Sequence, residues 1–127
     1  MNFVAVIAAI ALLQYIYFSY QVGQARGKYG VAAPAVTGDP IFERHHRVHQ
    51  NTLENLVVFL PGLWLFATYV NPLIASVLGL IVIVGRAIYA TRYVAEPESR
   101  GVGVAIYFPA MLVLVVGGAI GAVIAAF

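Results

Sequence analysis

The sequence contains no cysteine, and only 9% of its 127 residues are charged. Without cysteine the chain can form no disulfide, no thiolate metal site and no cysteine nucleophile, so any sulfur chemistry must come from a ligand. Ordinary soluble domains contain about 25% charged residues. Here 62% of the residues are hydrophobic and the mean hydropathy is +0.91. This composition predicts an integral membrane protein.

Four long apolar segments follow one another along the chain. A membrane-spanning helix needs about 20 residues, so we expect spans at Phe3 to Gln24, Val48 to Val70, Pro72 to Tyr93 and Val102 to Phe127. The competing interpretation of the first segment is a cleavable signal peptide. It is disfavoured because no basic residue precedes the apolar run and no cleavage site leads into a soluble domain. We predict an all-α membrane protein with a single four-transmembrane-helix domain over residues 1–127.

The charged residues gather in two connections. All seven Lys and Arg residues lie in or beside the link between the first two segments or the link between the last two. Cytoplasmic loops of membrane proteins are rich in Lys and Arg, so we expect both links to face the cytoplasm and both termini to lie opposite. The five carboxylates fall on the same side, and orientation alone does not require them. A polar site near the cytoplasmic surface explains both signs of charge.

The stretch ERHHRVHQNTLE, from Glu43 to Glu54, places polar residues at helical spacing beside the uncharged run LVVFLPGLWLFATYV. Four of them recur at steps of three, four and three, which puts them on one helix face: Arg44, Arg47, Asn51 and Glu54. A charge in hydrocarbon costs about 2.5 to 3.5 kcal/mol, so such residues normally face a bundle interior or a cavity. We expect the functional site here, on a helix that begins near Pro40 or Ile41.

The third segment carries a second polar stripe. Arg86, Tyr89 and Tyr93 are spaced three and four apart, and Arg100 follows the turn EPES. An aromatic belt at the headgroup level is the alternative explanation of the tyrosines. Arg86 lies some two turns inside the helix end, where burial of its charge predicts a pairing partner such as Glu54.

Prolines and glycines mark the helix interiors. Pro61 and Pro109 are expected to kink or loosen the second and fourth helices. Gly117 and Gly121 have the GxxxG spacing that lets another helix backbone approach closely. The fourth helix is therefore expected to pack against a neighbour through small residues.

The sequence also allows two other interpretations, a metal site and a drug exporter. His45 and His49 are four apart, as in a helical metal site, but arginines on that helix disfavour a cation and no third ligand has metal spacing. We predict no metal. A small four-helix drug exporter has a similar length, and such a transporter is expected to carry an acidic residue at mid-membrane in its first helix. The first segment here has none.

The strings ARGKY, TGDPIFERHHRVHQNTLEN, LWLF and GRAIYATRY, with a later arginine, resemble the MAPEG family, the membrane-associated proteins in eicosanoid and glutathione metabolism. The leukotriene-conjugating synthase and the microsomal glutathione transferases are the members most similar in spacing. The resemblance implies a four-helix bundle that assembles as a homotrimer, with glutathione as cosubstrate at sites between subunits. It implies lipids and a lipophilic electrophile as further partners, and no nucleic acid.

The resemblance also implies roles for individual residues. Five of them match positions that hold glutathione within one subunit: Arg47, Asn51, Glu54, Tyr89 and Tyr93. Arg26 matches a position that reaches the ligand from the neighbouring subunit, Arg100 matches the catalytic arginine that faces the sulfur, and His49 replaces a glutamine ligand. Gly27 and Asn55 depart from the synthase, which has an arginine and a tyrosine there. Glutathione binding is therefore better supported than leukotriene synthesis.

The chemistry of glutathione fits these side chains. The tripeptide carries two carboxylates and one ammonium group, which match arginine forks and a glutamate. Its thiol, with a pKa of about 8.5 for a free thiol, becomes more nucleophilic when a guanidinium lowers that pKa. We therefore predict a glutathione transferase or peroxidase that acts on lipophilic electrophiles in lipid metabolism or detoxification. The alternative is a non-catalytic scaffold of the same family that binds lipid or glutathione.

Overall fold

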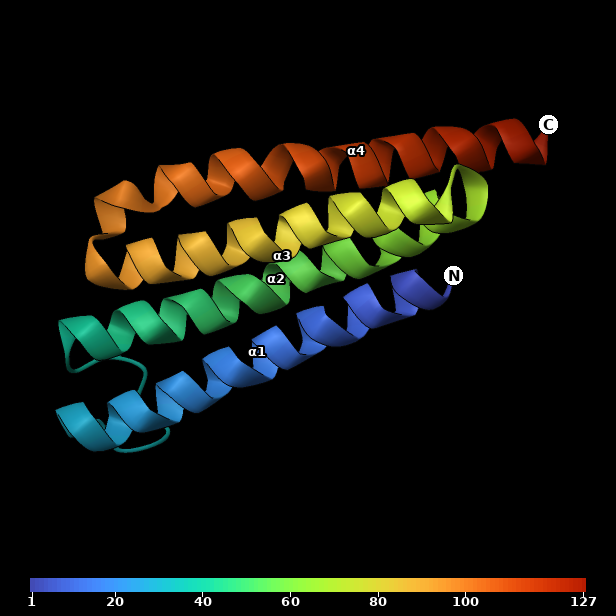
Figure 1. The fold of residues 1–127 in the computed structure, drawn as a ribbon. Coiled ribbons are helices and arrows are strands. Elements are labelled where there is room, and N and C mark those ends of the chain that lie inside the picture. Colours follow the sequence, from blue (N-terminus) through green and yellow to red (C-terminus); the bar gives the residue numbers. More distant parts are fainter.

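The computed structural model describes residues 1–127, and four long helices account for most of them (Figure 1). The elements, in chain order, are α1 (Asn2–Tyr29), α2 (Pro40–Tyr69), α3 (Pro72–Ala95), the 3-10 helix η1 (Pro97–Arg100) and α4 (Gly101–Ala126). Each of the four stretches Asn2–Tyr29, Pro40–Tyr69, Pro72–Ala95 and Pro97–Ala126 is long and apolar enough to span a membrane. The prediction of an all-α protein with four membrane-spanning helices is confirmed.

The helix ends follow from local sequence. The Asp39 carboxylate accepts hydrogen bonds from the backbone N–H groups of Ile41 and Phe42 at 2.9 and 3.0 Å, which caps α2 at the expected start. Asn71 caps α3 in the same way. Both caps precede a proline, which suits the first helical position because its missing N–H would have no partner there. Gly30, with φ of 69°, ends α1 in the left-handed conformation.

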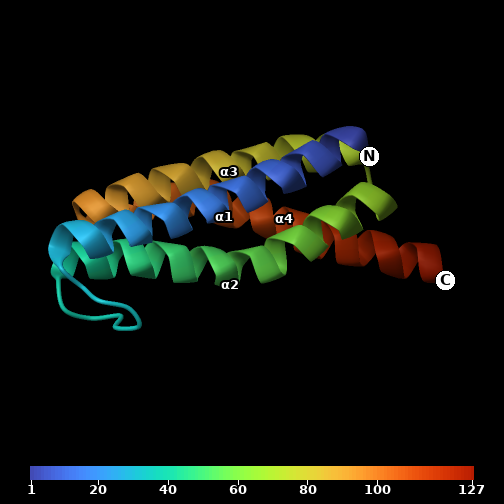
Figure 2. The same cartoon turned by 90° about the horizontal axis from the view of Figure 1, so that it is seen from below.

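The four helices run side by side and antiparallel to their neighbours in the chain. Figure 1 shows both termini and the α2–α3 turn at one end of the bundle. The other end, which we call the charged end, is formed by the last turns of α1 and α3, the first turns of α2 and α4, and the two connections between them. Figure 2 shows that α2 bends along its length, in the half that contains Pro61, as expected for a proline inside a helix.

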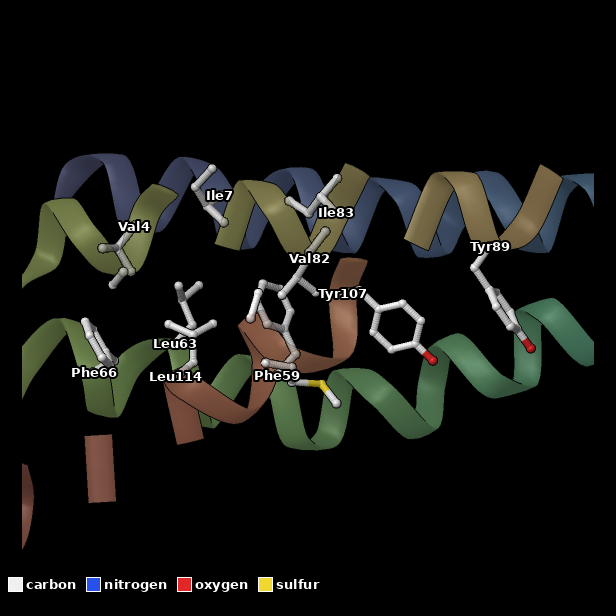
Figure 3. Packing of buried hydrophobic residues seen from close by; sticks show 14 of the residues in the cluster. Val4, Ile7, Phe59, Leu63, Phe66, Val82, Ile83, Tyr89, Tyr107 and Leu114 are labelled. Atoms are coloured by element: carbon white, nitrogen blue, oxygen red, sulfur yellow. The ribbon is translucent and has the colours of Figure 1, made fainter. Parts of the chain in front are cut away.

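A continuous core joins all four helices. Figure 3 shows side chains of this core, including Ile7 of α1, Phe59 and Leu63 of α2, Val82 of α3 and Leu114 of α4. Leu63 and Leu114 are 1% and 0% exposed. Lipid tails are as apolar as leucine, so this packing stabilises the bundle by close van der Waals contact rather than by removing surface from water.

Glycines of α4 let it approach α2 and α3 closely. A Cβ atom at Gly117 would lie 2.8 Å from the Phe66 ring of α2. A Cβ atom at Gly121 would lie 2.9 Å from the Tyr69 carbonyl oxygen of α2. The predicted close approach of another helix backbone is confirmed at Gly121 and at the neighbouring Gly118, whereas Gly117 faces the Phe66 side chain. Nearer the charged end, a Cβ at Gly103 would overlap the backbone of Tyr89. This last contact fixes the part of α3 that carries the tyrosine.

Candidate functional site

The polar residues of α2 point in different directions. Arg44 is half-buried, and its Nη1 donates to the carbonyl oxygen of Val94 at 3.0 Å, near the end of α3. Asn51 is also half-buried and turns toward the bundle interior. Arg47 and Glu54 are exposed. The stripe predicted from the sequence is thus divided: Arg44 joins two helices, and Arg47 and Glu54 remain on the surface of the single chain.

Arg86 is the buried cation of the bundle, with only 3% of its surface exposed. Its Nη1 donates to Asn51 Oδ1 and its Nη2 to Thr52 Oγ1, both at 2.7 Å. The guanidinium carbon lies 4.5 and 4.9 Å from the ring centres of Tyr89 and Tyr107, whose π faces attract a cation. Figure 3 shows these two rings at one end of the core. The charge is therefore held by an amide, a hydroxyl and two aromatic rings.

The prediction that Glu54 pairs with Arg86 is wrong. Both Nη atoms of Arg86 donate to other α2 residues, Asn51 and Thr52. Glu54 is exposed, whereas Arg86 is only 3% exposed, and the two side chains form no ion pair. Its carboxylate remains available to a ligand or to another chain.

An open cavity of about 450 Å³ lies at the charged end, where α2 begins and α3 ends. Eight residues line it: Val36, Pro40, Glu43, Arg44, His46, Arg47, Tyr93 and Pro97. Ligand pockets commonly occupy about 300 to 1,000 Å³, so this one has the volume for a small peptide. Its lining brings together Arg47 and Tyr93, two of the predicted glutathione ligands. Tyr89 is next to them, since its ring stacks on that of Tyr93 at 5.7 Å.

Arg100 lies on η1, close to this cavity in the chain. Pro97, which lines the cavity, accepts a hydrogen bond from Arg100 Nη1 at 3.0 Å through its carbonyl oxygen. Ser99 Oγ donates to the Glu96 carbonyl oxygen at 2.8 Å and stabilises the turn. Arg100 is exposed and is not among the lining residues, so the hydrogen bond to Pro97 is what places its guanidinium beside a residue of the cavity wall.

Six predicted site residues lie outside the cavity lining: Asn51, Glu54, Tyr89, Arg100, Arg26 and His49. Arg26 Nη1 donates to the Ala35 carbonyl oxygen at 2.6 Å, and its guanidinium lies 4.8 Å from the centre of the Phe42 ring. The His49 ring stacks on Tyr15 of α1 at 4.6 Å. Within one chain, Arg26 and His49 therefore serve contacts between α1, α2 and the loop that joins them.

The structure contains no group of three His, Cys, Asp or Glu side chains that could hold a metal ion.

Sequence reasoning missed several partners in the site. Thr52 and Tyr107 were not singled out, although both contact Arg86. Asn55 was noted only as a departure from the family, yet its Nδ2 donates to the carbonyl oxygen of Asn51 at 2.9 Å and to Asn51 Oδ1 at 3.2 Å. The four-residue spacing of the two asparagines is the signal that predicts this pair, because such residues are neighbours on a helix.

Comparisons with known proteins agree on one family. The model of the MAPEG family matches residues 4–120. An uncharacterized protein of Synechocystis sp. is 50% identical over 113 residues, which cover 89% of this chain and 82% of that protein. Microsomal glutathione S-transferase 2 of Homo sapiens is 38% identical over 117 residues, or 92% of this chain and 80% of the relative. Leukotriene C4 synthase of Cavia porcellus is 35% identical over 100 residues, or 76% and 67%.

Proposed function

Because this chain belongs to the MAPEG family, we propose that it is a glutathione-dependent integral membrane transferase that acts on lipophilic electrophiles. Similar proteins bear the names glutathione S-transferase and leukotriene C4 synthase, which supports glutathione as the cosubstrate. The observation that carries the proposal is the cavity at the charged end, where Arg47 and Tyr93 meet. Arg100 is hydrogen-bonded to Pro97, a residue of its lining.

Two side chains of the cavity lining, together with Glu54 farther along α2, complement the charges of glutathione. Arg47 offers a planar fork of donors, which suits a carboxylate in a bidentate contact. Glu54 is exposed on α2, one turn beyond Asn51 and two turns beyond Arg47. Its carboxylate suits the ammonium group of glutathione. Tyr93 supplies a hydroxyl that can donate to a remaining carboxylate or peptide oxygen. One face of α2 and the end of α3 therefore provide partners for all charged groups of the tripeptide.

Arg100 would supply the chemical activation. A guanidinium beside the glutathione sulfur favours the thiolate, so it lowers the pKa of the thiol and raises the fraction of nucleophile at neutral pH. The thiol proton leaves to solvent, the thiolate sulfur forms a bond to an electrophilic carbon, and the leaving group departs with the bonding pair. A lipophilic electrophile reaches the cavity from the bilayer, so the enzyme needs only to align it with the sulfur.

The exposed polar face of α2 supports assembly into a homotrimer, which we also propose. In a single chain Glu54 is exposed on the outer surface of α2, within the segment expected to span the membrane. A charge facing hydrocarbon costs about 2.5 to 3.5 kcal/mol, so covering this face with a second copy stabilises the assembly. Arg26 of one subunit would then exchange its bond to Ala35 for one to a ligand carboxylate bound at Asn51 of the next.

We propose that the charged end faces the cytoplasm. Lys and Arg concentrate there, as in cytoplasmic loops of other membrane proteins. Cytosolic glutathione would then reach the cavity directly from water.

Activity of the purified protein tests the function. Calorimetric titration with glutathione measures binding, and turnover is measured with an activated aryl chloride and, separately, with an organic hydroperoxide. We expect binding and conjugation of the aryl chloride; reduction of the hydroperoxide would add a peroxidase activity. Binding without either turnover would favour a scaffold, and no binding would overturn the proposal.

Mixing of variants tests the shared site. Co-assembly of Arg26→Ala subunits with Asn51→Ala subunits should restore some intact sites at subunit junctions, because each variant supplies the residue that the other lacks. Conjugation by the mixture should exceed the sum of the separate variants. Mixed assemblies no more active than that sum would show that each site is built within one chain.

A further inference from the structure

Two hydrogen-bond donors, one from Arg86 and one from Asn55, lie close to the same atom of the Asn51 side-chain amide. Arg86 Nη1 lies 2.7 Å from that atom and Asn55 Nδ2 lies 3.2 Å from it. A guanidinium carries only N–H donors, and an amide nitrogen is likewise a donor, so the atom that both approach must be the carbonyl oxygen. The oxygen of Asn51 is therefore occupied from inside the bundle, and its NH₂ group is the part left to face a ligand.

Arg86 is fixed in place, so it can fix Asn51 in turn. Its second hydrogen bond goes to Thr52 Oγ1, and the Thr52 hydroxyl donates its own proton to the Val48 carbonyl oxygen at 2.7 Å. That donation leaves a lone pair of Oγ1 for Arg86. Tyr89 and Tyr107 lie against the guanidinium. Its Nε has no partner, so the two bonds to α2 are the hydrogen bonds that set its position.

We propose that Arg86 is a positioning residue which, together with Asn55, makes Asn51 a hydrogen-bond donor in the glutathione site. This inference rests on the proposed function, because it takes Asn51 to contact glutathione. An amide locked in this orientation donates its N–H groups to an oxygen of the ligand, either of a carboxylate or of a peptide carbonyl, and offers no acceptor to the ammonium group. The ammonium must then bind a carboxylate, and Glu54 lies one turn along the same helix.

Asn51→Asp tests the orientation of the amide, with Asn51→Ala beside it. Aspartate has the same shape and still accepts from Arg86, so the bundle should keep its stability, but it presents an oxygen to the ligand instead of N–H groups. We expect calorimetry to show glutathione affinity about 10- to 100-fold lower for Asn51→Asp, at least as large a loss as for Asn51→Ala. Glutathione bound by Asn51→Asp as tightly as by the unmodified protein would overturn the proposed orientation.

A double-mutant cycle tests whether Arg86 acts through Asn51. We expect Arg86→Met to weaken glutathione binding about tenfold when Asn51 is present and less than about twofold in the Asn51→Ala background, because partners in one network are not additive. Arg86→Lys, which keeps one charged donor, should recover part of the loss. An equal loss in both backgrounds would show that Arg86 does not work through the asparagine.

Controls separate this inference from the proposed function. Arg92→Gln changes an exposed arginine of the same helix and should bind glutathione normally. Thermal unfolding of each variant identifies any that fail to fold, and if Arg86→Met does, the cycle is measured with Arg86→Lys. Absence of glutathione binding by the unmodified protein would overturn both proposals. Normal binding by the unmodified protein with an additive cycle would overturn only the positioning role.

Discussion

Removal of the Arg100 guanidinium should change the pH dependence of the reaction more than it changes the fold. Arg100 is exposed, and the hydrogen bond that it makes goes to Pro97 in its own turn. Surface substitutions of this kind usually change stability by less than about 0.5 kcal/mol. Arg100→Ala should therefore assemble normally, so that a change in rate reports on the reaction.

The size of the effect follows from Coulomb's law. A unit charge about 4 Å from the sulfur contributes about 1 kcal/mol in bulk water and about 4 kcal/mol at the effective dielectric constant of a protein surface. The cavity is open and Arg100 is exposed to solvent, so we expect a value near the lower end, about 1.4 kcal/mol, which is one pKa unit. Loss of the cation should raise the pKa of the bound thiol and lower the rate at neutral pH about tenfold.

The assay is the rate of conjugation of an activated aryl chloride, measured at saturating glutathione from about pH 6 to pH 10, a range that brackets the pKa of a free thiol. The thiolate is the reactive form, so the loss should be largest below the bound thiol's pKa in the unmodified protein. It should disappear above the raised pKa of the variant, where both thiols are ionised. Ultraviolet absorbance of the thiolate should shift along the same pH axis. Arg92→Ala serves as the matched control.

Two results would refute the reasoning. A rate reduced by the same factor at every pH would show that Arg100 does not act on ionisation of the thiol. A loss of glutathione affinity as large as the loss of rate would make Arg100 a carboxylate ligand instead, because a group acting on the sulfur should change affinity only a few-fold.

Three further perturbations address binding, packing and orientation. Arg47→Ala should lower glutathione affinity about 10- to 100-fold by calorimetry while sparing the rate at saturation, since it removes a charged hydrogen-bond partner; an unchanged affinity would exclude it from the site. Gly103→Val should destabilise the bundle by about 1 to 3 kcal/mol or more in thermal unfolding, because a side chain there overlaps the backbone of Tyr89; an unchanged melting temperature would contradict this. A reporter fused after Phe127 should lie opposite the cytoplasm, and a cytoplasmic signal would reverse the orientation.

The fold could be predicted because its main signals are local in sequence. Hydropathy alone separates the four spans, and Asp39 before Pro40 marks the start of α2 because a carboxylate cap and an N1 proline are independent helix signals. The GxxxG pair of α4 predicted a close helix contact. The sequence did not reveal which helix would supply that contact, since spacing describes one helix surface and not its neighbour.

The sequence patterns and the structure agree on the candidate site only at Arg47 and Tyr93. Helical spacing grouped the residues of α2 and those of α3 separately, and the structure places Arg47 and Tyr93 in one cavity. Helical spacing could not show that Asn51 and Thr52 of α2 face Arg86, because the rotation of a helix about its axis depends on the packing of all its neighbours. The contact of Arg26 with Ala35 depends on the path of the connecting loop, which no periodic pattern encodes.

The burial of Arg86 also constrains how the chain enters a bilayer. If α3 crossed alone, it would carry an uncompensated guanidinium into hydrocarbon at a cost of about 2.5 to 3.5 kcal/mol. The hydrogen-bond acceptors that offset this cost, Asn51 and Thr52, belong to the preceding helix. Only Val70 and Asn71 separate α2 from α3. The two helices can therefore enter the bilayer as one hairpin, in which Arg86 is already hydrogen-bonded to α2. We therefore expect α2 and α3 to insert together, because α2 alone would bring the Asn51 amide into the bilayer without its Arg86 partner.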